Sequence, residues 1–245
     1  MKIESVSNKK IKEYTKLHLK KERDKSNLFL VEGKHMVEEA YKANLLKELF
    51  VLENTEPFID FEMIECTQAV LNKLSNQVSN AKMIGVCTKP KEEIQDAPSS
   101  ILLLDSVQDP GNVGTLIRTA HSFGIDEIIL SKECCDIYNP KTIQSSQGAL
   151  FYIPIRYANL EEEIPSLQNQ GVTVYATALH HKSKSLQDTV KKTPYAILLG
   201  NEGQGVKSNL IEMCDACIKI EMDTFESLNV AIAGSICMYT FKYAK

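Results

Sequence analysis

Residues 101–120 read ILLLDSVQDPGNVGTLIRTA, a stretch that predicts a buried strand, a polar loop and then a helix. The run at 101–104 is continuously apolar, which is typical of a strand buried on both faces of a parallel sheet. Apolar residues at helical spacing predict a helix over 113–123, and 127–130 is a second strand-like run. The small and polar residues of the loop lie where parallel sheets bind ligands, at the carboxyl end of a strand.

Strands and helices continue to alternate toward the end of the chain. The pattern predicts strands over 172–177, 196–199 and 217–221 and a long helix from about 228 to 245. Because strands that are separated by helices indicate a parallel sheet, this half is of the α/β class. Two further loops, LGNEGQG at 199–205 and FESLNV at 225–230, place small or polar residues where a strand ends or a helix begins. We therefore expect three loops to carry the chemistry.

The segment KPKEEIQDAPSS at 89–100 combines prolines with charge and lacks apolar periodicity. It is interpreted as a linker near the boundary between a domain over 1–98 and a domain over 99–245. In the first domain the pattern predicts strands over 27–31, 49–52 and 83–87 and helices over 34–43 and 68–74. This domain is a small α/β unit in which no residues have catalytic spacing.

Charge is distributed unevenly along the chain. The 28 basic and 32 acidic residues give a formal charge of −4, which excludes a uniformly basic nucleic-acid coat protein. Residues 1–25 nevertheless hold nine basic and four acidic residues. A solvated helix face and a contact with a phosphate backbone explain this excess equally well. Only three basic residues are arginines, Arg23, Arg118 and Arg156, so a guanidinium is expected to matter where the chain keeps one.

What the sequence lacks excludes several classes of protein. It has no apolar run of 18 residues and its start lacks the apolar core of a signal peptide, so we expect a cytoplasmic protein. The absence of GxxxxGK[ST], and of GxGxxG after the first strand, argues against a P-loop NTPase and a standard dinucleotide site. The seven scattered cysteines indicate reduced thiols. Cys214 and Cys217 form a single CxxC and His180 and His181 lack a third ligand, so no metal site is expected.

Two features of the loops have more than one interpretation. The three glycines of LGNEGQG would let the backbone approach a ligand closely, although they also suit a hairpin-like connection. Asn112 could cap the first helix, and Arg118 could be an ordinary surface residue. The apolar neighbours of Arg118 instead indicate a guanidinium near a buried or interfacial edge, where it needs a partner, either Glu202 or a substrate phosphate.

Taken together, the segments DPGNVGTLIRTA, LGNEGQG and IKIEMDTFESLNVAIAGSI resemble the three motifs of the SpoU (TrmH) family of RNA ribose 2′-O-methyltransferases, within the SPOUT class. They occur in the family's order and at comparable spacing, and the resemblance covers about residues 100–245. Residues 1–98 resemble, by position and pattern, the N-terminal RNA substrate-binding domain of many members. In the third motif MDTFE stands where many relatives have a proline and small residues, so the resemblance implies the class of the protein but not the shape of the lip of the cofactor site.

The resemblance implies a parallel-sheet domain with a deep C-terminal trefoil knot, a homodimer formed through that domain, and S-adenosyl-L-methionine as the cofactor. It implies a catalytic group that consists of Asn112, Arg118, Glu202, Ser227 and Asn229. The cofactor-binding residues that it implies are Thr177, Gly200, Asn201, Glu202, Gly203, Ile220, Met222, Ser227, Leu228 and Asn229.

The reaction that the resemblance implies is transfer of a methyl group from S-adenosylmethionine to a ribose 2′-hydroxyl of RNA. Ribosomal RNA is favoured over tRNA because the first domain resembles that of rRNA-modifying relatives. A guanidinium has no free acceptor, so Arg118 is expected to hold a phosphate or stabilise the forming alkoxide, with Asn112 and Glu202 orienting it. A tRNA methyltransferase, a non-catalytic RNA-binding protein and a small-molecule enzyme are the alternatives. Contacts with RNA are expected from Lys9, Lys10, Lys12, Lys20, Lys21, Arg23 and Arg118.

Overall fold

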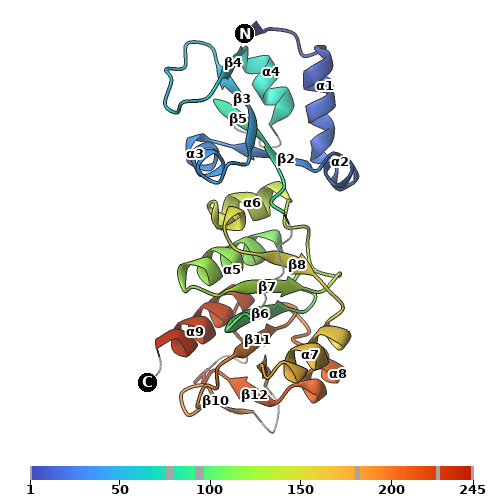
Figure 1. Cartoon of the computed structure of the whole chain (residues 1–245), viewed down its shortest axis with the longest axis vertical. Helices are drawn as coiled ribbons and strands as arrows, with labels where there is room; N and C mark the ends of the chain where they lie inside the picture. Colours follow the sequence, from blue (N-terminus) through green and yellow to red (C-terminus); the bar gives the residue numbers. More distant parts are fainter. Residues whose placement is uncertain (1, 76–79, 92–96, 180–182, 225–226, 244–245) are drawn as a thin grey trace. The chain divides into compact units, whose positions relative to one another are not determined.

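The computed structural model of the chain describes residues 2–75, 80–91, 97–179, 183–224 and 227–243 (Figure 1). Contacts divide the chain into two compact units. The first unit is Met1–Lys91 with Tyr138–Phe151, and the second is Glu92–Ile137 with Tyr152–Lys245. The boundary at 98/99 and the linker stay a prediction, since residues 92–96 lie outside the described ranges.

The first unit is built on a mixed five-stranded sheet. Its strand order is β1 (Lys2–Ile3), β4 (Met63–Cys66), β3 (Leu46–Leu52), β5 (Met83–Thr88) and β2 (Leu28–Glu32). The β1–β4 and β3–β4 pairs are parallel, whereas β5 runs antiparallel to both β3 and β2. The accompanying helices are α1 (Lys9–Thr15), the 3-10 turn η1 (Lys16–His18), α2 (Lys20–Ser26), α3 (Lys34–Lys42) and α4 (Gln68–Leu74).

A segment from later in the chain completes the core of this unit. Helix α6 (Pro140–Ser146) and the 3-10 turn η2 (Ala149–Phe151) pack with β2. The ring of Phe29 in β2 is fully buried, and its centroid lies 5.0 Å from that of Tyr138 and 6.0 Å from that of Phe151. Burial of an aromatic ring is a large stabilising contribution, so the later segment is part of this core.

The second unit is a seven-stranded sheet in which every described pair of strands is parallel. Its order is β10 (Lys184–Ser185), β12 (Ala216–Lys219), β9 (Thr173–Thr177), β11 (Tyr195–Leu199), β6 (Ser100–Leu104), β7 (Glu127–Leu130) and β8 (Ile155–Tyr157). The helices of this unit are α5 (Pro110–Ser122), α7 (Leu160–Asn169), α8 (Ser208–Met213) and α9 (Val230–Tyr243). The expected α/β class and parallel sheet are therefore confirmed.

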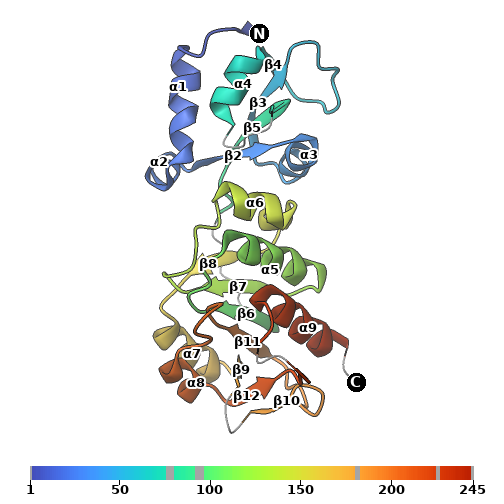
Figure 2. The same ribbon diagram turned by 180° about the vertical axis from the view of Figure 1, so that it is seen from behind.

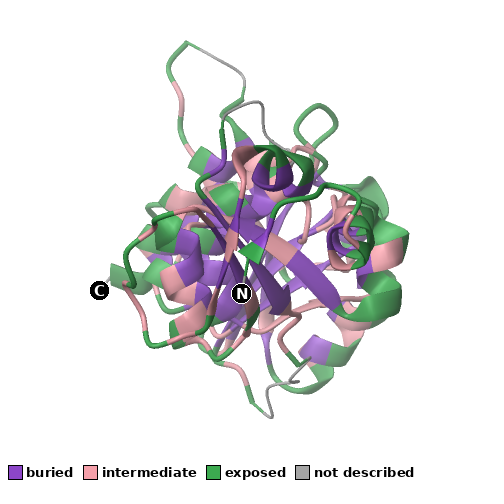
Figure 3. Cartoon of the chain, turned by 90° about the horizontal axis from the view of Figure 1, so that it is seen from above, coloured by how far each residue is buried: buried purple, intermediate pink, exposed green. Residues whose placement is uncertain are grey.

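Helices cover both faces of this sheet, with α5 and α9 on one side and α7 and α8 on the other (Figures 1 and 2). Alternate residues of a strand point to opposite faces, and the central strands divide in this way. Ile101 and Leu103 of β6 pack in one cluster with Ile164 of α7 and Leu210 of α8. In Figure 3 the buried residues follow the strands, and the exposed ones lie on helices and loops. The continuous apolar runs in the sequence reflect this burial on both faces.

Several elements were not predicted from the sequence. They include α1, α2, α6, α7, α8 and β8, most of which are short. Helix α7 also contains Pro165, which in the sequence argues against a helix interior. The trefoil knot stays a prediction, because the strand order does not by itself define how the chain is threaded.

Arg156, for which the sequence offers no function, holds strands and helix together in the second unit. Its Nε donates to Glu127 Oε1 at 2.6 Å, and its two terminal nitrogens donate to the two carboxylate oxygens of Glu163 at 3.0 and 2.6 Å. Glu127 is buried, so this forked arrangement compensates a carboxylate that would otherwise be costly to desolvate. The role of Arg156 is therefore structural.

The remaining expectations concern reduced cysteines, the paired histidines and the lack of a membrane-spanning helix. All seven cysteines are free thiols, and burial raises the pKa of Cys214 to about 12, so it is not a reactive thiolate. His180 and His181 lie outside the described residues. No helix in the described ranges is long and apolar enough to cross a membrane.

Candidate functional site

The carboxyl ends of the central strands of the second unit surround a cavity of about 480 Å³. The loops after β9, β11 and β12 line it, and the first turns of α9 close one side. Ligands of parallel sheets bind at this edge, where neighbouring loops diverge. The cavity therefore lies where the sequence predicts the chemistry.

Nine of the ten residues expected to bind the cofactor line this cavity. They are Thr177, Gly200, Asn201, Glu202, Gly203, Ile220, Met222, Ser227 and Leu228. The tenth, Asn229, is not among the lining residues, but it contacts the same loops from the start of α9. Apolar side chains such as Leu199 and Val230 complete the wall.

The loop after β11 is shaped by a close approach of backbone to backbone at Gly200. A Cβ added there would lie 2.1 Å from the carbonyl carbon of Gly205 and from the nitrogen of Val206. Two hydrogen bonds between the backbones of Asn201 and Gly205, at 3.0 and 2.9 Å, close the loop. The loop is thus hairpin-like and also lines the cavity, so the two interpretations of its glycines do not exclude each other.

Glu202 connects this loop to the one after β6. Its Oε1 accepts from the side-chain amide of Asn112 at 3.1 Å and from the backbone N–H of Asp109 at 3.1 Å. Its Oε2 accepts from the N–H of Gln108 at 3.3 Å. Partial burial alone would raise the pKa of Glu202, but these hydrogen bonds outweigh it and lower the pKa below its ordinary value of 4.5. The carboxylate is therefore held in its charged form.

Asn112 extends this connection to the third loop. Its side-chain oxygen accepts from Nδ2 of Asn229 at 2.9 Å, and Oδ1 of Asn229 accepts from the N–H of Ala231 at 2.9 Å at the start of α9. Glu202, Asn112 and Asn229 thus form one chain of hydrogen bonds across the three loops that the sequence singled out. Of the two remaining residues that were expected to be catalytic, Ser227 lies at the cavity wall, and Arg118 lies on α5.

The structure decides between the interpretations of Asn112 and Arg118 that the sequence leaves open. Asp109, and not Asn112, caps it, since the Asp109 side chain accepts from the N–H of Asn112 at 2.9 Å. Arg118 is exposed, and within the described ranges its guanidinium has neither a hydrogen bond nor an ion pair, with Glu202 or any other residue. Glu202 is instead engaged by Asn112, so neither residue orients Arg118 by a direct contact here. The guanidinium is free to meet a ligand.

Asp105 is a site residue that the motifs do not include. Its side chain is fully buried directly after β6, where Oδ2 accepts from the N–H of Lys207 at 3.0 Å and Oδ1 lies 3.2 Å from Nζ of Lys207. A second hydrogen bond joins the same two loops, since Nδ2 of Asn201 donates to the carbonyl of Ser106 at 2.8 Å. These contacts fix the loop after β11 to the loop after β6. The signal in the sequence is a carboxylate that directly follows the continuous apolar run at 101–104.

The lining of the cavity fits S-adenosylmethionine. Apolar walls from Leu199, Ile220 and Leu228 suit an adenine ring, and the tight loop at 200–206 offers backbone groups for its polar edges. In the described part of the chain no group of three or more His, Cys, Asp or Glu side chains could hold a metal ion.

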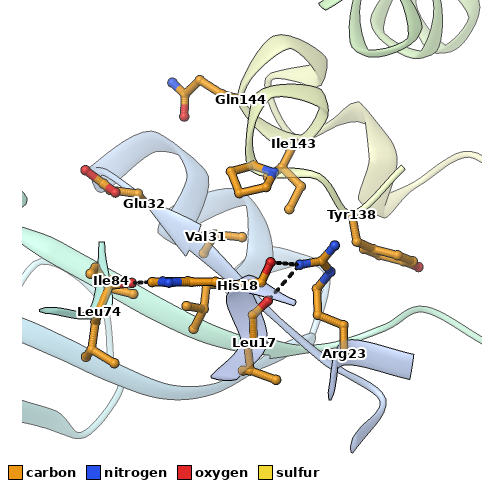
Figure 4. A pocket seen from close by; sticks show the side chains of 12 residues that line it. Leu17, His18, Arg23, Val31, Glu32, Leu74, Ile84, Tyr138, Ile143 and Gln144 are labelled. Atoms are coloured by element: carbon orange, nitrogen blue, oxygen red, sulfur yellow. Dashed lines mark hydrogen bonds between the residues drawn. The ribbon is translucent and has the colours of Figure 1, made fainter. Parts of the chain in front are cut away.

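The basic start of the chain is only partly the exposed surface that the sequence predicts. Lys9, Lys12, Lys20 and Lys21 are exposed, and Lys10 is paired with Glu48 at 2.9 Å. Arg23 is buried with 5% of its surface exposed, and its NH1 donates to the carbonyls of Leu17 at 2.7 Å and His18 at 2.9 Å (Figure 4). The prediction that Arg23 contacts RNA does not fit this burial, because the guanidinium serves as an internal clamp.

Comparisons with known proteins agree with this geometry. Residues 99–239 match a family model described as the SpoU rRNA Methylase family, and residues 8–85 match one described as an MRM3-like substrate binding domain. A protein of Bacillus subtilis named 23S rRNA (guanosine(2553)-2′-O)-methyltransferase RlmP is 40% identical over 243 residues, which cover 97% of each chain.

Solved structures extend the likeness over both units. The crystal structure of an AdoMet-bound rRNA methyltransferase from Sinorhizobium meliloti shares 28% identity and a TM-score of 0.86, and covers 99% of this chain and 97% of its own. A crystal structure described as an RNA 2′-O ribose methyltransferase shares 27% identity and a TM-score of 0.84, over 98% of this chain and 97% of its own.

Proposed function

The chain belongs to the SpoU rRNA methylase family, and we propose that it transfers the methyl group of S-adenosylmethionine to a ribose 2′-hydroxyl of 23S rRNA. The observation that carries this proposal is the hydrogen-bonded chain of Glu202, Asn112 and Asn229 beside the cavity after β11. It joins all three family motifs at one point. The target nucleotide is the guanosine equivalent to the one in the name of the Bacillus subtilis relative, because the two sequences are 40% identical in an alignment that covers 97% of both chains.

The two units have different roles in this proposal. Residues 1–98 bind the RNA substrate, and residues 99–245 form the methyltransferase domain with its trefoil knot, in keeping with the family models at 8–85 and 99–239. Thr177, Gly200, Ile220, Met222 and Leu228 hold the cofactor by apolar contact and through their backbone groups.

Bound S-adenosylmethionine supplies an electrophilic methyl group, so the protein has to position the ribose hydroxyl and accommodate the proton that it loses. Alignment of two reacting groups at about 3 Å supplies a large part of such a rate enhancement. Arg118 is exposed and without a partner in the described residues, so its guanidinium can hold a substrate phosphate or stabilise the developing alkoxide. Asn112 and Glu202 keep the start of α5 fixed to the cofactor loop, and thereby set where Arg118 stands.

A homodimer through the second unit is the proposed working form. Four large apolar or aromatic side chains on α9, Ile232, Ile236, Tyr239 and Tyr243, are exposed. Their spacing of four, three and four residues places them on one face of the helix. An exposed apolar stripe of this kind marks a protein interface.

An rRNA substrate also favours a cytoplasmic location for the protein.

The proposal is tested by mapping ribose methylation in 23S rRNA from cells with and without the gene, and then by methyl transfer from labelled S-adenosylmethionine to the unmodified RNA. We expect one 2′-O-methylated guanosine to be lost without the gene and restored in vitro. Methylation confined to tRNA would transfer the activity to the tRNA alternative. Binding of rRNA without cofactor binding in calorimetry would show a non-catalytic RNA-binding protein.

A further inference from the structure

The first unit contains an open groove between α1 and α2, with a volume of about 510 Å³. We call it the α1–α2 groove. Its rim carries four lysines, Lys9 and Lys12 of α1, Lys16 at the start of η1 and Lys25 of α2. Tyr14, Leu17 and Leu28 supply the buried apolar part of its lining. Figures 1 and 2 show α2 lying at the end of α1, so that both helices can face one groove.

The spacing of the lysines explains why they gather on one side. Residues three, four and seven apart share a helix face, and Lys9, Lys12 and Lys16 follow this spacing along α1 into η1. Lys25 comes from the last turn of α2, at the other side of the groove. The corner between η1 and α2 is fixed by Arg23, whose NH1 binds the carbonyls of Leu17 and His18. The buried guanidinium thus shapes the groove instead of contacting a ligand.

The charges of these four lysines are available for a ligand. Within the described ranges none of Lys9, Lys12, Lys16 and Lys25 has an ion pair or a side-chain hydrogen bond, whereas Lys10 on the same helix is paired with Glu48. Only two carboxylates, Glu13 and Glu22, line the groove beside the four lysines, so the lining keeps a net positive charge. Four ammonium groups above an apolar floor suit a nucleic-acid strand, because its phosphates are anionic and its bases have apolar faces.

We propose that the α1–α2 groove binds the sugar–phosphate backbone of the RNA substrate, an inference that rests on the function proposed above. Lysine is a mobile point charge that binds phosphates well, and contacts with phosphates carry no sequence information, so the groove anchors RNA without reading its sequence. The apolar floor accommodates a ribose or the face of an unpaired base, as in other single-strand-binding sites. Lys16 and Lys25 are thereby added to the RNA contacts, and Arg23 is removed from them.

The test is salt-dependent binding of a 23S rRNA fragment that contains the target guanosine. A quadruple variant with Lys9, Lys12, Lys16 and Lys25 each changed to Gln should bind at least about tenfold more weakly near 0.1 M salt. Removal of each lysine–phosphate interaction should reduce the slope of log K against log salt by about 0.7, so the slope should fall by up to roughly 3. S-adenosylmethionine affinity should be unchanged, which shows that the second unit remains folded.

A matched control removes the same charge from four lysines of the first unit that do not line the groove. They are Lys34, Lys42, Lys47 and Lys82, each changed to Gln. Their slope should stay close to that of the unaltered chain. Equal slopes and affinities for the groove variant and the unaltered chain would overturn the groove while leaving the methyltransferase intact.

The remaining outcomes are also decisive. If the unaltered chain bound no rRNA, the groove and the proposed function would both fail. If the groove variant kept its affinity for naked rRNA but lost affinity for ribosomal particles, the groove would belong to an acidic protein surface, and the RNA assignment would be overturned.

Discussion

The three arginines of the chain occupy three different environments. Arg23 is buried on backbone carbonyls, Arg156 lies between two glutamates, and Arg118 is exposed on α5. A guanidinium presents five N–H donors in a fixed planar arrangement and so satisfies several fixed acceptors at once, which explains Arg23 and Arg156 as structural residues. Arg118 has no such acceptors in the described residues, so an external ligand is left to explain it.

Replacement of Arg118 by Lys should remove most of the methylation while the affinity for S-adenosylmethionine is retained. Lysine keeps the charge but cannot present two parallel donors to a phosphate, so the loss tests the guanidinium geometry. Single-turnover methylation of rRNA and cofactor calorimetry measure the two quantities separately. A fully active Lys variant would contradict the role given to the fork.

Gly200 and Gly203 lie in one loop but differ in the space around them. At Gly200 an added Cβ meets backbone atoms at 2.1 Å, whereas at Gly203 the nearest atom is Asn201 Oδ1 at 3.7 Å. Gly200→Ala should therefore reorganise the loop and weaken S-adenosylmethionine binding by at least roughly tenfold, or about 1.4 kcal/mol. Gly203→Ala should cause a much smaller loss. Calorimetry on both variants checks this, and equal affinities would refute the steric argument.

The lowered pKa of Glu202 predicts how the loop responds to acid. The folded-state pKa lies below 4.5, so the hydrogen bonds of this carboxylate stabilise the fold fully above that value. Their contribution is lost as the pH falls through the lowered pKa. The difference in melting temperature between the unaltered chain and Glu202→Gln should therefore be constant above about pH 5 and shrink toward pH 3. A difference that stays constant down to pH 3 would show that Glu202 does not titrate in this way.

At the scale of elements, the close contact of α9 with α5 and β11 depends on Gly234. A Cβ there would lie 2.5 Å from Leu116 Cδ2 and 2.6 Å from Leu199 Cδ1. Alanine would gain about 1 kcal/mol in helix propensity but would overpack the interface at a cost of about 1–3 kcal/mol. Gly234→Ala should thus be neutral to destabilising by up to about 2 kcal/mol in denaturant unfolding. A clear stabilisation would mean that the two leucines move aside freely.

Elements differ in how well the sequence predicts them. The central strands β6, β7 and β11 are buried on both faces, so they are continuous apolar runs and were predicted within a residue of their ends. Helices α1, α2 and α6 hold too few apolar residues for a clear helical period, whereas α4, which has the same length of seven residues, was predicted because Val70, Leu71 and Leu74 lie at helical spacing. A cap at Asn112 was one interpretation of the sequence, but Asp109 is an equally good capping residue, and only the hydrogen bond distinguishes the two.

At the scale of the whole molecule, the motifs predict the residues of the site but not their pairing. Glu202 was expected beside Arg118, yet the structure places it on Asn112, 90 positions away in the sequence. Asp105 was missed because its partner, Lys207, lies outside the motifs. Contacts of this range depend on strand order, and no local pattern contains that information.

The proposed dimer leads to a prediction at the same scale. Ile232 on α9 is 54% exposed and belongs to the apolar stripe, whereas Val190 is 85% exposed and lies elsewhere in the same unit. Ile232→Glu should weaken self-association by at least about tenfold, because a charge would be buried without a partner. Val190→Glu should leave it unchanged. Sedimentation over a range of concentrations measures both, and a monomeric unaltered chain would contradict the dimer.

The packing of α6 with β2 limits how this protein can exchange parts with its relatives. A recombination event or an engineered chimaera that replaced only residues 1–91 would bring in a new β2 while retaining the old α6 and η2. Phe29 would then be replaced by the donor's residue opposite the original Tyr138 and Phe151. A working exchange of RNA specificity therefore has to transfer two separate stretches of the gene, 1–91 and 138–151, as one inherited unit.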